Sequence, residues 1–175
     1  KTMRAATARG GLMLLLMIAA NFLRAEGTPA WQQCSEARVE ALGFIEVATA
    51  SLWRSNCGEI DLSPPLRLQF DYSRSVPGEA MAKAAMAMVE RNISEALFET
   101  LGQRLQNFSD RFEDIARGDR YELLYLEDGQ VEMRLNGELL ANEQGHQFAN
   151  AYLQIWFGPK PYSRDMKQSL LRAAR

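Results

Sequence analysis

The sequence has little of what most metal sites and nucleic-acid-binding proteins require. Its 175 residues include one histidine and two cysteines, whereas structural zinc sites usually take four Cys or His ligands. Its 20 lysines and arginines face 22 aspartates and glutamates, so no excess of positive charge is available to hold a phosphate backbone. We therefore expect no metal, no cofactor and no nucleic acid among its partners.

The chain also lacks an apolar run long enough to cross a bilayer. The longest run, residues 12–23, covers 12 residues, against the ~20 that a membrane-spanning helix needs. Basic residues precede this run and small residues follow it. The order is typical of a secretory signal peptide that is cleaved after Ala25 or, alternatively, after Ala30. A membrane anchor and a core helix are the other interpretations.

Loss of residues 1–25 would remove four basic residues and no acid, and would leave 16 basic and 22 acidic residues. We expect residues 31–175 to form one domain, because domains commonly have roughly 100–200 residues. The predicted mature protein is a periplasmic protein of a bacterium, without a stable membrane span.

The two cysteines, Cys34 and Cys57, flank an apolar segment with Gly43 near its middle. If this segment forms a hairpin or a bent pair of strands, both cysteines return to the same end of it. In the oxidising compartment that export implies, they are candidates for a disulfide. Two unpaired thiols are the alternative.

The remaining pattern divides into strands and helices. Residues 38–53 are rich in β-branched and aromatic side chains, and residues 66–72 alternate apolar and polar positions, so both predict strand. Good helix formers fill residues 78–92. Apolar stripes at helical spacing continue through residues 93–105 and predict a further short helix over residues 108–118.

Two turn dipeptides, Asp-Gly at 128–129 and Asn-Gly at 136–137, then separate short strand-like runs. Such dipeptides favour type I′ hairpin turns, whose two central residues both need positive φ. They predict a meander of strands over residues 121–127, 130–135 and 138–141. Helical patterns over residues 146–157 and after Ser163 follow.

Strands that enclose a helical block, without regular βαβ alternation, indicate the α+β class with a mainly antiparallel sheet. The order of the pieces also resembles the chalcone isomerase-like family, in its bacterial exported branch, over about residues 36–172. The resemblance is carried jointly by Leu-Gly-Phe-Ile-Glu-Val at 42–47, Leu-Arg-Leu-Gln-Phe-Asp-Tyr at 66–72, Gly-Asp-Arg-Tyr at 118–121 and Ile-Trp-Phe-Gly at 155–158.

This resemblance implies an open-faced β-sandwich, in which helices are layered on one face of a large antiparallel sheet. It also implies a cleft between the two layers that can hold an apolar ligand. Family members include plant enzymes that close chalcones to flavanones, non-catalytic fatty-acid-binding relatives, and bacterial proteins of unsettled role.

The plant enzymes use an arginine, a threonine, a tyrosine and an asparagine in that cleft. By the resemblance, the arginine corresponds to Arg38, and the threonine falls at Ala48, with Thr49 beside it. The tyrosine and the asparagine fall near Met81 and Met88. Three of the four polar positions are then apolar, which argues against chalcone isomerase activity.

The same replacements make the cleft more apolar. Fatty-acid-binding relatives hold the ligand's carboxylate with an arginine and a tyrosine, and the resemblance leaves several candidates for these roles. The candidate ligand-binding residues are Arg38, Thr49, Tyr72, Met81, Met88, Tyr121 and Tyr125. A methionine stripe at helical spacing is more often plain core packing than a ligand wall, and a strand arginine is more often exposed than a buried anchor.

Three functions follow from this interpretation. The first is an exported, non-catalytic protein that binds a fatty-acid-like or other apolar ligand between sheet and helices. The second is an isomerase or intramolecular lyase acting on an apolar carbonyl compound, which needs at least two polar groups converging in the cleft. The third is a structural or interaction module with a filled cleft. An open apolar pocket near Met81 and Met88 would favour the first function over the third.

Overall fold

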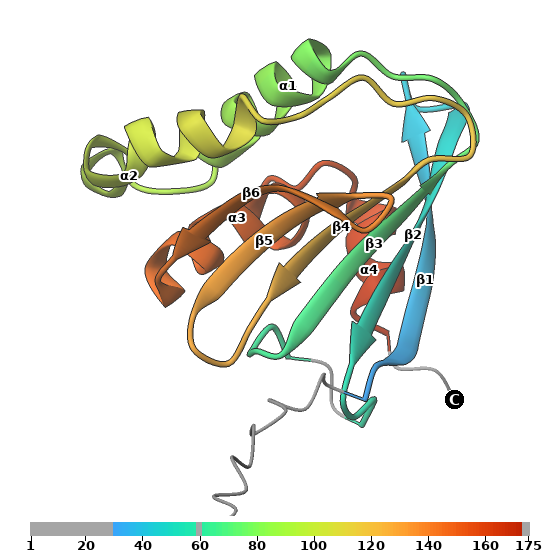
Figure 1. The fold of residues 1–175 in the computed structure, drawn as a ribbon, viewed down its shortest axis with the longest axis horizontal. Helices are drawn as coiled ribbons and strands as arrows, with labels where there is room; N and C mark the ends of the chain where they lie inside the picture. The colour runs from blue at the N-terminus through green and yellow to red at the C-terminus, as the bar shows by residue number, and fades with distance from the viewer. Residues whose placement is uncertain (1–29, 59–60, 173–175) are drawn as a thin grey trace, which may run out of the picture.

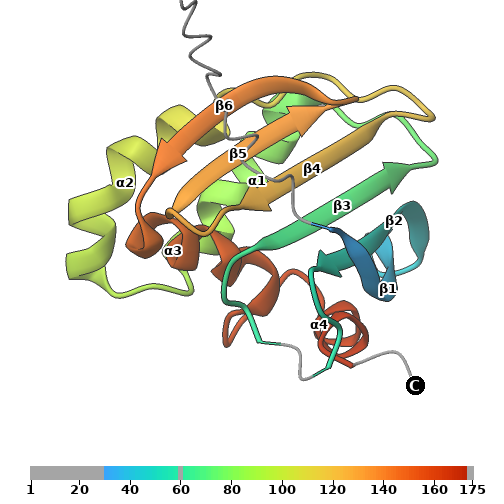
Figure 2. The same cartoon turned by 60° about the horizontal axis from the view of Figure 1, so that its bottom comes forward.

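The computed structural model describes residues 30–58 and 61–172, in which one antiparallel sheet is covered on one face by helices (Figures 1 and 2). The signal peptide predicted over residues 1–25 lies outside the described residues. Within the described ranges no helix is both long and apolar enough to cross a membrane.

The strands of the described chain lie side by side in the order in which they occur in the sequence. They are β1 (Gln32–Ala41), β2 (Ile45–Arg54), β3 (Leu66–Tyr72), β4 (Arg120–Tyr125), β5 (Gln130–Leu135) and β6 (Glu138–Gln144). The helices α1 (Gly78–Glu90) and α2 (Glu95–Ser109) are inserted between β3 and β4, and α3 (His146–Phe157) and α4 (Arg164–Leu170) follow β6. The α+β class with helices on one face of an antiparallel sheet, predicted from the sequence, is confirmed.

The segment predicted as strand over residues 38–53 is a hairpin of β1 and β2. Leu42 and Gly43 turn the chain with φ values of 55° and 77°. At the other end of the hairpin, pairing of Gln33 with Trp53 brings the cysteines together. A disulfide joins Cys34 to Cys57, whose Cα atoms are 5.0 Å apart. The disulfide considered from the sequence is therefore present in the structure.

The β1–β2 pairing shifts by one residue near its turn. Val39 is paired with Ala48, but Glu40 is paired with Glu46. Val47 is therefore an extra residue on β2, and a bulge of this kind redirects a side chain. Val47 faces the space between sheet and helices as a result.

The meander of β4, β5 and β6 forms as predicted. Asn136 and Gly137 both have positive φ, at 52° and 86°, as a type I′ turn requires. At the other turn only Gly129 has positive φ, at 88°, and its N–H donates to the carbonyl of Leu126. That turn is therefore a longer loop rather than a two-residue type I′ turn.

The predicted short helix over residues 108–118 is wrong. Helix α2 ends at Ser109, and the chain after it is extended enough for Ile115 to form an antiparallel bridge with Val76, with reciprocal backbone hydrogen bonds of 2.9 and 3.0 Å. Backbone pairing with the segment that leads into α1 outweighs the local helical pattern. The bridge ties the start of α1 to the end of the inserted helical block.

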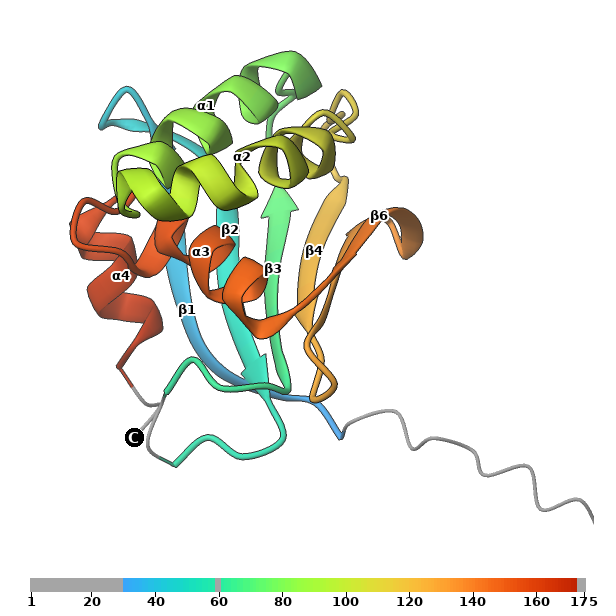
Figure 3. The same cartoon turned by 90° about the vertical axis from the view of Figure 1, so that its left-hand side faces the viewer.

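The helix-facing side of the sheet and the inner faces of the helices form the core. Phe108 of α2 packs edge-on against Phe148 and Tyr152 of α3, at ring centroid distances of 5.3 and 5.0 Å. Helix α4 lies over β1, with Met166 and Leu170 buried (Figure 3). This packing fixes α3 against the sheet, and α1 lies beside it.

A glycine is required where α1 begins. The backbone N–H of Gly78 donates to the Asp114 carboxylate at 2.9 Å, and a Cβ on Gly78 would lie 2.6 Å from the carbonyl carbon of Glu113. We expect Gly78→Ala to lower the free energy of unfolding by about 2 kcal/mol, the usual cost of overpacking. Urea denaturation checks this value, and Gly102→Ala, whose Cβ meets only ordinary contacts, is the control. Equal stability of the two variants would contradict the expectation.

Candidate functional site

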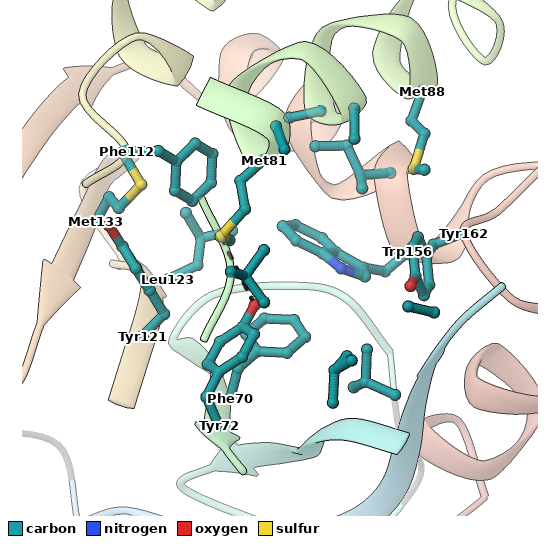
Figure 4. A pocket seen from close by; sticks show the side chains of 18 of the residues that line it. Phe70, Tyr72, Met81, Met88, Phe112, Tyr121, Leu123, Met133, Trp156 and Tyr162 are labelled. Carbon is teal, nitrogen blue, oxygen red and sulfur yellow. Dashed lines mark hydrogen bonds between the residues drawn. The ribbon is translucent and has the colours of Figure 1, made fainter. Parts of the chain in front are cut away.

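A cavity of about 210 Å³ lies between the sheet and the helices. One water needs only about 10–15 Å³ on the same measure, so the two layers do not close upon each other here. The walls come from the inner faces of strands β1 to β5, from α1 and α3, and from the segment between α3 and α4 (Figure 4). The cleft is therefore open rather than filled.

Helix α1 forms one wall. Met81, Ala85 and Met88 lie on its inner face and line the cavity. Ala80 and Ala84 also line it and are exposed to solvent, so the cavity reaches the surface along this helix. Methionine side chains are flexible and polarisable, and they adapt to irregular apolar surfaces.

The wall opposite α1 is aromatic. Phe70 on β3 packs against Trp156 on α3, with ring centroids 5.5 Å apart. Tyr72 on β3 meets Tyr121 on β4 edge-on at 6.5 Å. In Figure 4 these rings lie below Met81 and Met88, so that sulfur and aromatic groups face each other across the space.

The segment before α4 closes one side with Tyr162. Asn92, just beyond α1, accepts a hydrogen bond from the backbone N–H of Lys160 at 2.7 Å and donates to the Lys160 carbonyl at 2.8 Å. The Arg91 guanidinium donates to the carbonyls of Lys160 and Pro161, each at 2.9 Å. The end of α1 thereby holds Tyr162 in place beside Met88.

The hydroxyl of Tyr72 is directed into the cavity and has only a weak partner. It donates to the Met81 thioether sulfur at 4.0 Å, and sulfur is a poor acceptor. Burial, with smaller contributions from Tyr162 and Tyr121, raises the pKa of Tyr72 above its ordinary value. A tyrosine hydroxyl is protonated in neutral water in any case, so this hydroxyl is available to donate to a ligand.

The other tyrosine hydroxyls of the wall are engaged with the protein. Tyr121 accepts from the backbone N–H of Glu113 at 2.8 Å, and Tyr162 donates to the Glu40 carbonyl at 2.8 Å. Tyr152 is within 3.3 Å of the Ser109 hydroxyl. Among the described residues, Tyr72 thus carries the one lining hydroxyl that lacks a strong partner.

The cavity has no charged side chain to balance a buried ion. Among the described residues that line it, Glu122 alone has a charged side chain. Its carboxylate is paired with Arg67 at 3.4 Å on the face of the sheet that the helices leave uncovered. An unpaired carboxylate inside the cavity would carry a large desolvation cost.

Four of the predicted ligand-binding residues, Tyr72, Met81, Met88 and Tyr121, come together around the cavity. That they bind a ligand remains a prediction. Tyr125 lies on the same face of the sheet but does not line the cavity, because its hydroxyl is 2.7 Å from Nδ1 of His146 at the start of α3.

The expectation that Arg38 and Thr49 face the cleft needs correction. They are paired with each other across β1 and β2, and Thr49 is paired with Asp71, which places them on the uncovered face of the sheet. The Arg38 side chain is 78% exposed and lies 3.6 Å from Glu46. Ala48, one residue from Thr49, is fully buried on the helix-facing side.

Sequence reasoning missed several lining residues. Trp156 and Tyr162 were not among the predicted ligand-binding residues, and Tyr162 lies in a Pro-rich connection that carries no periodic pattern. Val47 points inward only because of the bulge in β2, which no local pattern announces. The role of Asn92 in anchoring the segment of Tyr162 depends on a contact 68 residues away in sequence, which no local pattern predicts.

A profile described as chalcone isomerase-like matches residues 56–172. The chain belongs to the chalcone isomerase-like family. Residues Met81 and Met88 fall within the matched range, whereas Arg38 and Ala48 precede it.

The family fold is also found among solved structures. A crystal structure titled as a fatty-acid binding protein of Arabidopsis thaliana is similar with a TM-score of 0.58 and 11% sequence identity, over 82% of this chain and 88% of that one. At this identity the likeness concerns the fold alone. No curated protein sequence matches this member of the chalcone isomerase-like family.

Proposed function

We propose that this protein binds one apolar small molecule, a fatty-acid-like or similar compound, in the cavity between sheet and helices, without transforming it. The observation that carries the proposal is an open apolar cavity with one weakly partnered hydroxyl, that of Tyr72. Apolar pockets with a few placed polar groups are the usual form of small-molecule sites. The fold it shares with a protein titled as fatty-acid binding adds support.

The two rival functions fit the geometry less well. An interaction module with a filled cleft would not contain a cavity of about 210 Å³. Catalysis on a carbonyl compound needs polar groups that converge on the reacting atoms, and Arg38, the candidate cation, lies on the other face of the sheet. Binding requires only apolar walls and a hydrogen-bond donor, and the cavity has both.

The electrostatics of the cavity constrain the ligand. With no cation among its described lining residues, the cavity favours a neutral oxygen at Tyr72 over a buried carboxylate. A fatty acid would keep its ionised carboxylate at the solvent-exposed mouth beside Ala80 and Ala84. A neutral analogue of equal chain length should bind more tightly at neutral pH.

Binding is proposed to take place in the periplasm after signal-peptide removal. The basic and apolar pattern of residues 1–25 and the disulfide between Cys34 and Cys57 support export, because disulfides persist in oxidising compartments. Sequencing the amino terminus of protein from a periplasmic extract tests this, and an uncleaved cytosolic chain would contradict it.

The Tyr72 hydroxyl can be tested by a matched pair of variants. Tyr72→Phe should weaken binding of a long-chain alcohol or aldehyde about tenfold, the value of one hydrogen bond to a buried group. Tyr125→Phe removes a hydroxyl that is bound to His146 outside the cavity, and should leave the affinity unchanged. Titration calorimetry measures both, and equal affinities of the two variants would refute the role given to Tyr72.

The proposal as a whole is tested by displacement of a fluorescent apolar probe. Hexadecanoate, hexadecanol and a flavanone should compete with the probe at a single site. Failure of the protein to bind the probe or any of these compounds would count against a carrier and favour an interaction module.

A further inference from the structure

Apolar side chains protrude at the turn between β1 and β2. Among the described residues, the strongly exposed large apolar side chains are Leu42, Phe44 and Leu139, which are 81%, 77% and 46% exposed. Two of the three flank a single glycine at this turn. Turns are ordinarily made of polar residues or glycine, so a Leu-Gly-Phe tip is unusual.

Leu42 is also in a backbone conformation that a bulky side chain adopts with difficulty. Its φ is 55°, in the region that favours glycine and asparagine. Either of those residues would reduce both the backbone strain and the exposed apolar surface. Leu42 therefore does not stabilise the fold of the chain itself, which points to a contact outside the chain.

The turn lies at the rim of the cavity. Ala41 immediately precedes Leu42, and both Ala41 and Val47 line the cavity. Tyr162, also in the cavity wall, is bound through its hydroxyl to the carbonyl of Glu40. Figure 3 shows the turn, in cyan, projecting beside α1, the helix along which the cavity reaches the surface.

Charges near the tip are mixed in sign. Arg38 lies 3.6 Å from Glu46, and the Arg74 guanidinium donates to the Glu46 carbonyl at 3.0 Å. Arginines that flank protruding apolar side chains are suited to the headgroup level of a bilayer. Glu40 and Glu46 offset the charge of these arginines. Insertion of the apolar tip, rather than attraction to anionic lipid, should therefore contribute most to binding of a bilayer.

We propose that Leu42 and Phe44 insert into the surface of a lipid bilayer and bring the mouth of the cavity to the membrane, where an apolar ligand can enter or leave without crossing water. The bilayer contact rests on the tip alone, whereas its use in loading rests on the proposed function. A bilayer is favoured over a protein partner because the tip is a narrow protrusion and offers no broad face.

Co-sedimentation with phosphatidylcholine vesicles, with and without phosphatidylglycerol, tests the contact. The wild-type protein should partition onto both kinds of vesicle, with only a few-fold difference between them. Leu42→Asn and Phe44→Ser should each reduce partitioning about tenfold, as expected from losing one buried apolar side chain. Leu139→Asn, at the third exposed position on β6, should behave as wild type.

Asparagine suits the positive φ at position 42 and Phe44 is 77% exposed, so neither variant should have a lower thermal midpoint than the wild type. The inference is overturned if wild-type protein does not bind vesicles, or if the tip variants bind them as well as Leu139→Asn does. It is also overturned if light scattering shows that the wild type is a dimer and the tip variants are monomers.

Solution binding and transfer separate this inference from the proposed function. The tip variants should bind hexadecanol in solution with wild-type affinity, but should accept it from donor vesicles at least about tenfold more slowly. Vesicle binding without any ligand binding would refute the proposed function and leave the bilayer contact standing. Ligand binding without vesicle binding would refute the contact alone.

Discussion

Replacing Ala85 with phenylalanine should abolish ligand binding. Ala85 is buried on the inner face of α1 and lines the cavity between Met81 and Met88. A phenyl ring projecting from this position would occupy much of the cavity of about 210 Å³. We expect the affinity for hexadecanol to fall at least about 100-fold, since the displaced ligand loses the burial of several methylene groups at about 0.8 kcal/mol each.

The matched control is Ala87→Phe, on the solvent-exposed side of the same helix. It adds the same ring and the same change in helix propensity, but leaves the cavity open, so the affinity should stay at the wild-type value. Ala84→Phe, at an exposed position of the cavity wall, places a ring at the mouth with less risk to the core. Wild-type affinity of both Ala85→Phe and Ala84→Phe would place the ligand elsewhere.

Removal of the disulfide should cause the largest loss of stability. Cys34 and Cys57 close a loop between residues that are 23 apart in sequence, and the chain-entropy relation gives about 3 kcal/mol for a loop of this length. The variant Cys34→Ala/Cys57→Ser is suitable because Cys34 is fully buried and a serine there would bury a hydroxyl. Its unfolding midpoint in urea should fall accordingly.

Reduction provides the control for the disulfide. Dithiothreitol should lower the stability of the wild-type protein by the same amount and leave the double variant unchanged. Because the disulfide lies at the end of the hairpin opposite its turn, ligand affinity of the folded double variant should be retained. Equal midpoints for the oxidised wild type and the double variant would contradict the predicted contribution.

Local patterns predicted most of the fold. The period-2 alternation of residues 66–72 and the Asn-Gly turn at 136–137 identified β3 and the β5–β6 hairpin, because both signals depend only on near neighbours. The one helix predicted wrongly, over residues 108–118, failed because the bridge between Val76 and Ile115 joins residues far apart in sequence. Helix propensity depends on near neighbours in sequence and therefore cannot predict such a bridge.

The cavity was predictable in part. The helical spacing of Met81 and Met88 placed them on one face of α1, and the structure puts that face on the cavity. The prediction that Arg38 is the charged partner of a ligand was wrong because side chains alternate along a strand. Arg38 and Val39 are neighbours and point to opposite faces, and Val39 is the one that lines the cavity. The distinction between a weakly partnered Tyr72 and an engaged Tyr125 depends on contacts with Met81 and His146 that no sequence pattern contains.

We expect the cavity to hold one apolar molecule. Native mass spectrometry of protein purified gently from the cells that produce it naturally, followed by denaturing extraction, tests this most directly. The expected result is one apolar compound per chain, which is lost on denaturation and is absent from the Ala85→Phe variant but present in Ala87→Phe. A mass equal to that of the bare chain, unchanged after exposure to hexadecanol, fatty acids and flavonoids, would contradict it.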